Sequence, residues 1–121
     1  MAVEDRPWLY RLAGPLSAGV PLAAGSDAPF GDANPWAAMQ AAVDRRSADG
    51  QRIGADEALT PDQALVLFLS PPAAPGAPPP RLAVGAVADL CLLQSPWRQA
   101  ARALSAVRVR QTWRDGQALL P

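Results

Sequence analysis

The chain has 121 residues, a length typical of one domain. Eleven arginines balance eleven acidic residues, there is no lysine, and the net charge is zero, so the composition gives no electrostatic case for binding nucleic acid or an anionic membrane. The absence of histidine excludes any histidine-based metal or catalytic site formed by this chain alone.

Neither a signal peptide nor a membrane span is predicted. Residues 1–6 lack the basic and apolar regions of a signal peptide, and prolines and glycines interrupt the most apolar window, residues 12–25. The single cysteine, Cys91, lies in the apolar run of residues 90–93, where a buried and unreactive thiol is expected. With no partner for a disulfide in the chain, this cysteine usage favours a cytoplasmic location.

The beginning of the chain predicts a short helix and then a strand. Residues 5–12 have the spacing of an amphipathic helix, which Gly14 and Pro15 are expected to break. The continuous apolar run of residues 20–25 favours a strand that is buried on both faces, as in a parallel sheet.

A helix with a well-marked start follows. Asn34 is suited to the N-cap and Pro35 to the first helical position, so a helix is predicted over residues 35–47, with its exit marked by Gly50. Its apolar face is predicted to contain Trp36, Met39 and Val43.

A second helix is predicted over residues 61–69, because Thr60 and Gln63 have the spacing of a capping box. Residues 71–80 hold six of the fourteen prolines and predict a stiff, non-helical connector, or alternatively a polyproline motif that docks a partner. The apolar face of the helix is predicted to contain Ala64, Leu65, Phe68 and Leu69.

In the last third of the chain, the spacing of the apolar residues changes from helical to an alternation of apolar and polar residues, which is typical of strands. Residues 82–93 and 107–120 are predicted to form antiparallel β-structure, with helical spacing between them over residues 97–104. Asp115 and Gly116 form a strong hairpin signal near the end.

Asp27 is the residue that could carry chemistry. It follows the strand predicted over residues 20–25, and α/β barrels place active-site groups at the carboxyl ends of their strands. A carboxylate there can ligate a divalent metal and accept a proton from water. The alternative is that Ser26 and Asp27 only cap a turn before Pro29.

Several short motifs occur in an order that points to one protein family. They are Gly25-Ser26-Asp27-Ala28-Pro29, Asn34-Pro35-Trp36, Arg45-Arg46, Thr60-Pro61-Asp62-Gln63 and Gly85-Ala86-Val87-Ala88-Asp89-Leu90, before a closing strand that ends in Asp115-Gly116. This succession resembles the C-terminal part of the amidohydrolase superfamily, of the amidohydrolase-3 type that is related to N-acyl and formamide hydrolases. The resemblance covers almost the whole chain.

The resemblance implies an α/β fold, namely the last βα portion of a (β/α)8 metal-dependent hydrolase barrel plus antiparallel strands of a small β-sandwich domain. On this basis, residues 1–70 are expected to belong to the barrel. Residues 71–81 are expected to be a proline-rich connector, and residues 82–121 to belong to the sandwich.

The resemblance also implies roles for single residues. The aspartate after strand eight is the metal ligand or general base in such enzymes, and here that residue is Asp27. Asp89 is expected to satisfy amides of a turn in the sandwich, while Leu90 and Leu92 pack inward.

Three further residues are expected to have structural roles. Arg45 and Arg46 match an arginine pair that follows the strand-eight helix, and they are expected to form a structural or solvated helix end. Trp36 is expected to anchor the core rather than to contact substrate.

The chain departs from the family pattern because it has no H-x-H pair, no other histidine and no lysine. A barrel of this kind takes about 250 residues. The chain is therefore expected to be a C-terminal fragment, inactive alone and without a cofactor of its own. The complete enzyme is expected to use a divalent metal, with zinc favoured, to hydrolyse carbon–nitrogen bonds of an amide-type small molecule.

Two alternatives remain open. The chain could be one half of a split enzyme whose N-terminal companion chain supplies the other metal ligands. It could also be a small non-catalytic interaction module.

Overall fold

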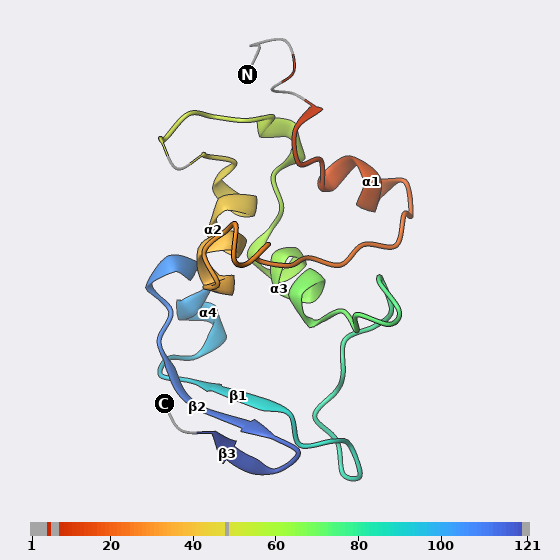
Figure 1. Ribbon diagram of the computed structural model, residues 1–121, viewed down its shortest axis with the longest axis vertical. Helices are drawn as coiled ribbons and strands as arrows, with labels where there is room; N and C mark the ends of the chain where they lie inside the picture. The colour runs from red at the N-terminus through yellow and green to blue at the C-terminus, as the bar shows by residue number, and fades with distance from the viewer. Residues whose placement is uncertain (1–4, 6–7, 48, 120–121) are drawn as a thin grey trace.

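The computed structural model describes Asp5, residues 8–47 and residues 49–119 (Figure 1). These residues form helices and, in the last third of the chain, an antiparallel sheet whose first two strands are separated by two short helices, which is compatible with the predicted α/β class. No helix among them is long and apolar enough to cross a membrane. In chain order the elements are α1 (Ala13–Ser17), α2 (Pro35–Asp44), the 3₁₀ helix η2 (Ala55–Glu57), α3 (Pro61–Leu69), β1 (Leu90–Leu93), α4 (Trp97–Ala100), the 3₁₀ helix η3 (Leu104–Ala106), β2 (Val109–Arg114) and β3 (Gln117–Leu119).

The two longest helices begin where the sequence predicts. The side chain of Asn34 accepts a hydrogen bond from the Trp36 backbone N–H at 3.0 Å, and Pro35 is the first residue of α2. At α3, the Gln63 N–H donates to Thr60 Oγ1 at 3.2 Å and the Thr60 N–H donates to Gln63 Oε1 at 2.8 Å. Each cap satisfies backbone donors that have no partner within the helix, and both predicted starts are confirmed.

The end of α2 differs from the prediction. The helix stops at Asp44, and Arg45 caps it in the left-handed conformation, with φ of 50°. The Arg45 backbone N–H donates to the Ala41 carbonyl at 2.8 Å. Gly50 lies in the turn that follows, so it does not mark the exit of this helix.

The beginning of the chain also differs from the prediction. Residues 6 and 7 of the helix predicted over 5–12 lie outside the described residues, and residues 9–12 are turn and coil. Gly14 and Pro15 lie in the first turn of α1 rather than breaking a helix. Proline is tolerated there because its missing N–H would have no helical partner.

Residues 20–25 do not form the predicted strand. The segment is extended, and the Ala24 N–H donates to the Leu67 carbonyl of α3 at 3.0 Å, but no described strand pairs with it. Val20 is 46% exposed rather than buried. A parallel strand needs neighbouring strands on its sides, and the described strands of this chain pair only with one another.

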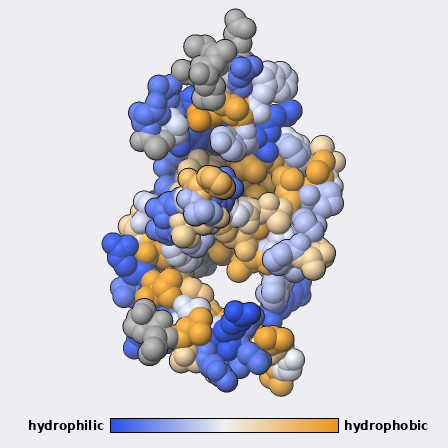
Figure 2. Space-filling model, in the orientation of Figure 1, coloured by the Kyte–Doolittle hydropathy of each residue, from blue (hydrophilic) through white to orange (hydrophobic). Residues whose placement is uncertain are grey.

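The hydrophobic core lies mainly between α2 and α3, and Figure 2 shows hydrophobic residues gathered on the surface over the middle of the molecule, where these two helices lie. The predicted apolar face of α2 is confirmed, because Met39 is buried and Trp36 and Val43 pack against the core. The predicted face of α3 is partly wrong, since Leu67 is buried while Leu69 is 46% exposed. The buried residues of the core cluster are Met39, Leu59, Ala64, Leu67 and Leu104.

The proline-rich connector is free of helix, as predicted, and folds back toward the start of the chain. The Gly76 N–H donates to the hydroxyl of the buried Ser70 at 2.8 Å. Gly76 has φ of 79°, and a Cβ atom at this position would lie 2.7 Å from Cα of Pro21. Glycine is therefore required where the connector passes residue 21.

The three strands form an antiparallel sheet in the order β1-β2-β3 (Figure 1). The predicted hairpin at Asp115 and Gly116 joins β2 to β3. Residue 120, at the end of the predicted β-structure, lies outside the described residues, and residues 82–89 form a turn and coil instead of strand.

The sheet lies outside the core. No strand residue belongs to the core cluster or packs against it, and Figure 1 shows the sheet at the end of the molecule opposite α1. Leu90 and Leu92 are 37% and 45% exposed, so the prediction that they pack inward is wrong. A sheet buries an apolar face only against a second layer, and the core cluster provides none here.

Candidate functional site

Asp27 lies at a turn after the extended segment of residues 20–25. Its backbone has φ of 58°, and its carbonyl accepts hydrogen bonds from the N–H groups of Phe30 and Gly31, both at 2.9 Å. Its side chain is exposed, and within the described residues the carboxylate has no hydrogen-bond partner. The main chain of Asp27 closes the turn, while its carboxylate is available for other interactions.

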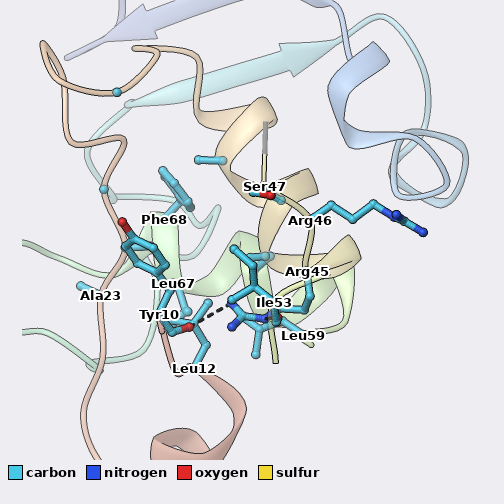
Figure 3. Close-up of a pocket in the computed structure, with 17 residues that line it drawn as sticks. Tyr10, Leu12, Ala23, Arg45, Arg46, Ser47, Ile53, Leu59, Leu67 and Phe68 are labelled. Carbon is cyan, nitrogen blue, oxygen red and sulfur yellow. Dashed lines mark hydrogen bonds between the residues drawn. The ribbon is translucent and has the colours of Figure 1, made fainter. Parts of the chain in front are cut away.

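An apolar groove of about 630 Å³ lies close to this turn in the chain (Figure 3). Gly25 and Gly31, on either side of Asp27 in the sequence, belong to its lining. A Cβ atom on Gly31 would collide with the Ser26 carbonyl oxygen, so a side chain at position 31 would force the turn apart. The helices contribute Ala38, Ala41, Ala42, Leu67 and Phe68 to the lining.

The residues of this chain do not fit a catalytic zinc site by themselves. Catalytic zinc takes three protein ligands and keeps one open position. Among the described residues, no three His, Cys, Asp or Glu side chains are close enough together to hold a metal ion. Asp27 can supply at most one such ligand.

Arg45 is the most extensively hydrogen-bonded side chain near the groove. It is 5% exposed, and its Nε donates to the carbonyls of Ile53 at 3.0 Å and Gly54 at 3.1 Å. Its Nη1 donates to the Tyr10 carbonyl at 2.9 Å (Figure 3). Its Nη2 donates to the Leu9 carbonyl at 2.8 Å. The guanidinium therefore joins the N-terminal segment to the loop before η2.

Glu57 completes this connection from the other side. It is 8% exposed, and its Oε2 accepts hydrogen bonds from the backbone N–H groups of Leu12 at 2.9 Å and Gly14 at 2.8 Å. Arg11 Nε donates to Glu57 Oε1 at 2.8 Å. The Gly14 N–H and the Arg11 side chain together hold the pKa of the Glu57 carboxyl at about 2, below its ordinary value of 4.5.

The pKa of the Arg45 guanidinium is shifted as well. Burial lowers it, and the nearby negative charge of Glu57 opposes that shift.

Gly14 allows the Glu57 carboxylate to approach the start of α1. A Cβ atom on Gly14 would lie 2.7 Å from Glu57 Oε1 and 2.5 Å from Arg11 Nη2. Arg11 is also positioned by Trp8, whose ring centroid is 5.4 Å from the arginine Cζ. No local pattern in the sequence indicates this network, because the bonds that Arg45 and Glu57 make to residues 9–14 join residues 35 to 46 positions apart along the chain.

The neighbouring arginine has a different environment. Arg46 is exposed, its Nη1 donates to the Gly50 carbonyl at 2.8 Å, and Figure 3 shows its side chain pointing away from Arg45. The prediction of a structural or solvated helix end is confirmed, because Arg45 is structural and Arg46 is solvated.

Asp89 has the role predicted for it at a turn. Its Oδ1 accepts a hydrogen bond from the Asp115 backbone N–H at 2.7 Å, and the Gly116 N–H donates to the Ala88 carbonyl at 3.1 Å. These two bonds connect the segment before β1 to the hairpin between β2 and β3. Asp89 therefore stabilises a turn of the sheet.

Cys91 is exposed, so the prediction of a buried thiol is wrong. It lies in β1, which is an edge strand. Partial burial raises the pKa of the thiol, which keeps it protonated and unreactive at neutral pH.

The model of the amidohydrolase family matches residues 1–119. No curated protein and no solved structure matches the chain.

Proposed function

Because the chain belongs to the amidohydrolase family, we propose that it is the C-terminal part of a metal-dependent hydrolase. The proposed substrate is a small molecule with a non-peptide, amide-type carbon–nitrogen bond. The family match supports a hydrolase, and the lack of histidine and lysine supports a site whose other residues lie outside this sequence. Zinc is the proposed metal of the complete enzyme, and the single cysteine supports a cytoplasmic location.

The proposed architecture is the last βα portion of a (β/α)8 barrel followed by strands of a small β-sandwich. Residues 20–25 support the first part, because they form no helix and run as a drawn-out trace past α3 (Figure 1), as a strand of a barrel would. The antiparallel sheet, which has no layer of the core against it, supports the second.

Asp27 is the catalytic residue that we propose on this chain. The observation that carries the proposal is its exposed carboxylate, which lies directly after an extended segment and has no partner within the described residues. A carboxylate in this state can ligate a metal or accept a proton from the attacking water.

Co-expression with an N-terminal companion tests this function. The DNA upstream of the gene is searched for a reading frame that encodes an H-x-H pair, and the two polypeptides are produced together. We expect a soluble complex that releases amine from N-acyl substrates when zinc is supplied. A complex that forms but cleaves none of a panel of amides would contradict the proposed reaction.

The role of Asp27 is tested in the same complex. We expect Asp27→Asn to lower turnover by about 100-fold or more, because the substitution keeps the shape but removes the charge. Asp32→Asn is the matched control, since Asp32 is an exposed carboxylate in the same loop and the amide can still accept the Asn34 N–H. Equal rates for the two variants would exclude Asp27 from the chemistry.

A non-catalytic interaction module is the second candidate function. The observation that favours it is that the helical part has a core of its own and a buried hydrogen-bond network around Arg45 and Glu57. Two results together would support this alternative. The chain alone would unfold cooperatively, and its complex with the companion polypeptide would hydrolyse no amide.

A further inference from the structure

A second groove, of about 590 Å³, lies where the helices approach the sheet. Residues of α2, α3 and α4 line it, together with residues of β1 and of the segments 80–83 and 86–89. Figure 2 shows the molecule hollowed between its middle and the end where the sheet lies. We call this site the sheet-side groove, and its volume is within the range of pockets that bind small molecules.

The lining of the sheet-side groove is mostly apolar. The helices contribute three aromatic side chains, Trp36, Phe68 and Trp97. Leu82 and Val87, from the segment before β1, also belong to the lining, yet they are 87% and 69% exposed. Apolar side chains that surround a concave site and remain in water are stabilised when an apolar ligand covers them.

The aromatic part of the lining is held in place by hydrogen bonds between the helices. The Trp97 indole N–H donates to Asp62 Oδ1 at 2.6 Å, which joins α4 to the first turn of α3. The Ser105 N–H of η3 donates to the Gln40 side chain of α2 at 3.2 Å. Because the polar atom of Trp97 is used by Asp62, which does not belong to the lining, the indole presents apolar atoms to the groove. A ligand therefore meets a preformed surface.

The charged residues of the lining are suited to an anionic group. Among the described residues these are Arg81 and Asp89. The Asp89 carboxylate accepts the Asp115 N–H at 2.7 Å and so serves the turn of the sheet. Arg81 is exposed and has no ion pair or hydrogen bond with the described part of the chain. A free guanidinium beside an apolar site is suited to hold a carboxylate through two parallel hydrogen bonds.

We propose that the sheet-side groove binds a small carboxylate with a long apolar body, of the chemical class of medium-chain fatty acids. The apolar body covers Leu82 and Val87, and the carboxylate pairs with Arg81. The buried apolar area supplies the affinity, and the arginine selects a negative head group. This proposal does not depend on the hydrolase activity, because Asp27 does not belong to the lining of this groove.

Calorimetric titration of the full 121-residue chain with dodecanoate, below the micelle concentration, tests the proposal. We expect saturable binding at one site per chain. Dodecyltrimethylammonium has the same apolar body but a positive head group, and we expect it to bind at least about tenfold more weakly. Absence of saturable dodecanoate binding, or equal binding of the two compounds, would overturn the proposal.

A charge-removing variant tests the assignment of Arg81. We expect Arg81→Gln to weaken dodecanoate binding at least about tenfold, and to leave the binding of uncharged decanol unchanged. Arg52→Gln is the matched control, because Arg52 is also exposed but lies outside the lining, and it should bind dodecanoate as the original chain does. Equal weakening by both substitutions would show that only net charge matters, against the proposal. Far-UV circular dichroism checks that each variant folds.

Cys91 reports whether the ligand occupies this groove. It is the one cysteine of the chain, it is exposed, and it belongs to the lining. We expect saturating dodecanoate to slow its alkylation by N-ethylmaleimide at least about tenfold, at a mildly alkaline pH where part of the thiol is ionised. Unchanged alkylation beside bound dodecanoate would place the ligand elsewhere and overturn the proposal. Alkylation that slows as the chain is concentrated without ligand would also overturn it, because a second copy would then cover the groove.

Discussion

At the scale of single residues, the buried charges of Arg45 and Glu57 are used to connect segments that are far apart in the sequence. Arg45 donates to four carbonyls, and Glu57 accepts from two backbone N–H groups and from Arg11. A buried charge is tolerated only when it is paired and hydrogen-bonded in this way. Together the two side chains fix residues 9–14 against residues 53–57.

Replacing Arg45 should destabilise the protein clearly. We expect Arg45→Ala to lower the free energy of unfolding by about 3 kcal/mol, because the backbone carbonyls that it binds lose a charged donor. Arg46→Ala is the control and should change it by less than about 0.5 kcal/mol, since Arg46 is exposed. Urea denaturation measures both variants, and equal effects would contradict the role assigned to Arg45.

The stability of the fold should also depend on the Glu57 carboxylate at acid pH. Its pKa is about 2 in the folded chain, below the ordinary 4.5, so its contribution is complete above about pH 4.5 and is lost as the pH falls toward 2. We expect the free energy of unfolding, measured in urea across this range, to fall more steeply for the original chain than for Glu57→Gln. Parallel pH profiles for the two proteins would count against this assignment.

At the scale of secondary-structure elements, the caps of α2 and α3 depend on a few neighbouring side chains. Asn34, Thr60 and Gln63 bond to backbone groups within three residues of themselves. Such local bonds act in the same way in almost any tertiary context, which explains why both helix starts were predicted.

Removing the cap of α3 should have a moderate cost. We expect Thr60→Ala to lower the free energy of unfolding by about 1 kcal/mol, because the Gln63 N–H loses its acceptor. Ser105→Ala removes a hydroxyl from an exposed position without a cap and should be nearly neutral. Thermal unfolding compares the two variants, and a neutral Thr60→Ala would show that packing alone holds this helix.

At the scale of the whole molecule, the hydrophobic core lies apart from both Asp27 and the sheet. The core joins α2, α3 and η3, whereas Asp27 lies in an exposed turn and the sheet lies outside the core cluster. The chain therefore folds around its helices and presents Asp27 and its strands on the surface.

The purified chain should not retain zinc. Asp27 is a single carboxylate, the chain contains no histidine, and the described residues include no group of three metal-binding side chains. We expect less than stoichiometric zinc by elemental analysis after dialysis, and the same value for Asp27→Ala. Bound zinc at one per chain that disappears in Asp27→Ala would contradict this expectation.

The sequence by itself determined the features that arise from neighbouring residues. These are the starts of α2 and α3, the hairpin at Asp115 and Gly116, and the family to which the chain belongs. The turn role of Asp89 also followed, through the resemblance, because the motif that contains it was recognised. Caps and turns depend on contacts within a few residues, so a local pattern is sufficient to predict them.

Only the tertiary structure decided which residues meet across long separations. It showed that Arg45 and Glu57 are buried and bonded, that residues 20–25 are extended without strand partners, and that Leu92 and Cys91 are exposed. A hydrophobic pattern predicts that a segment can be buried, but burial requires a second layer to pack against it. Whether that layer exists depends on the whole arrangement of the chain, which no local pattern contains.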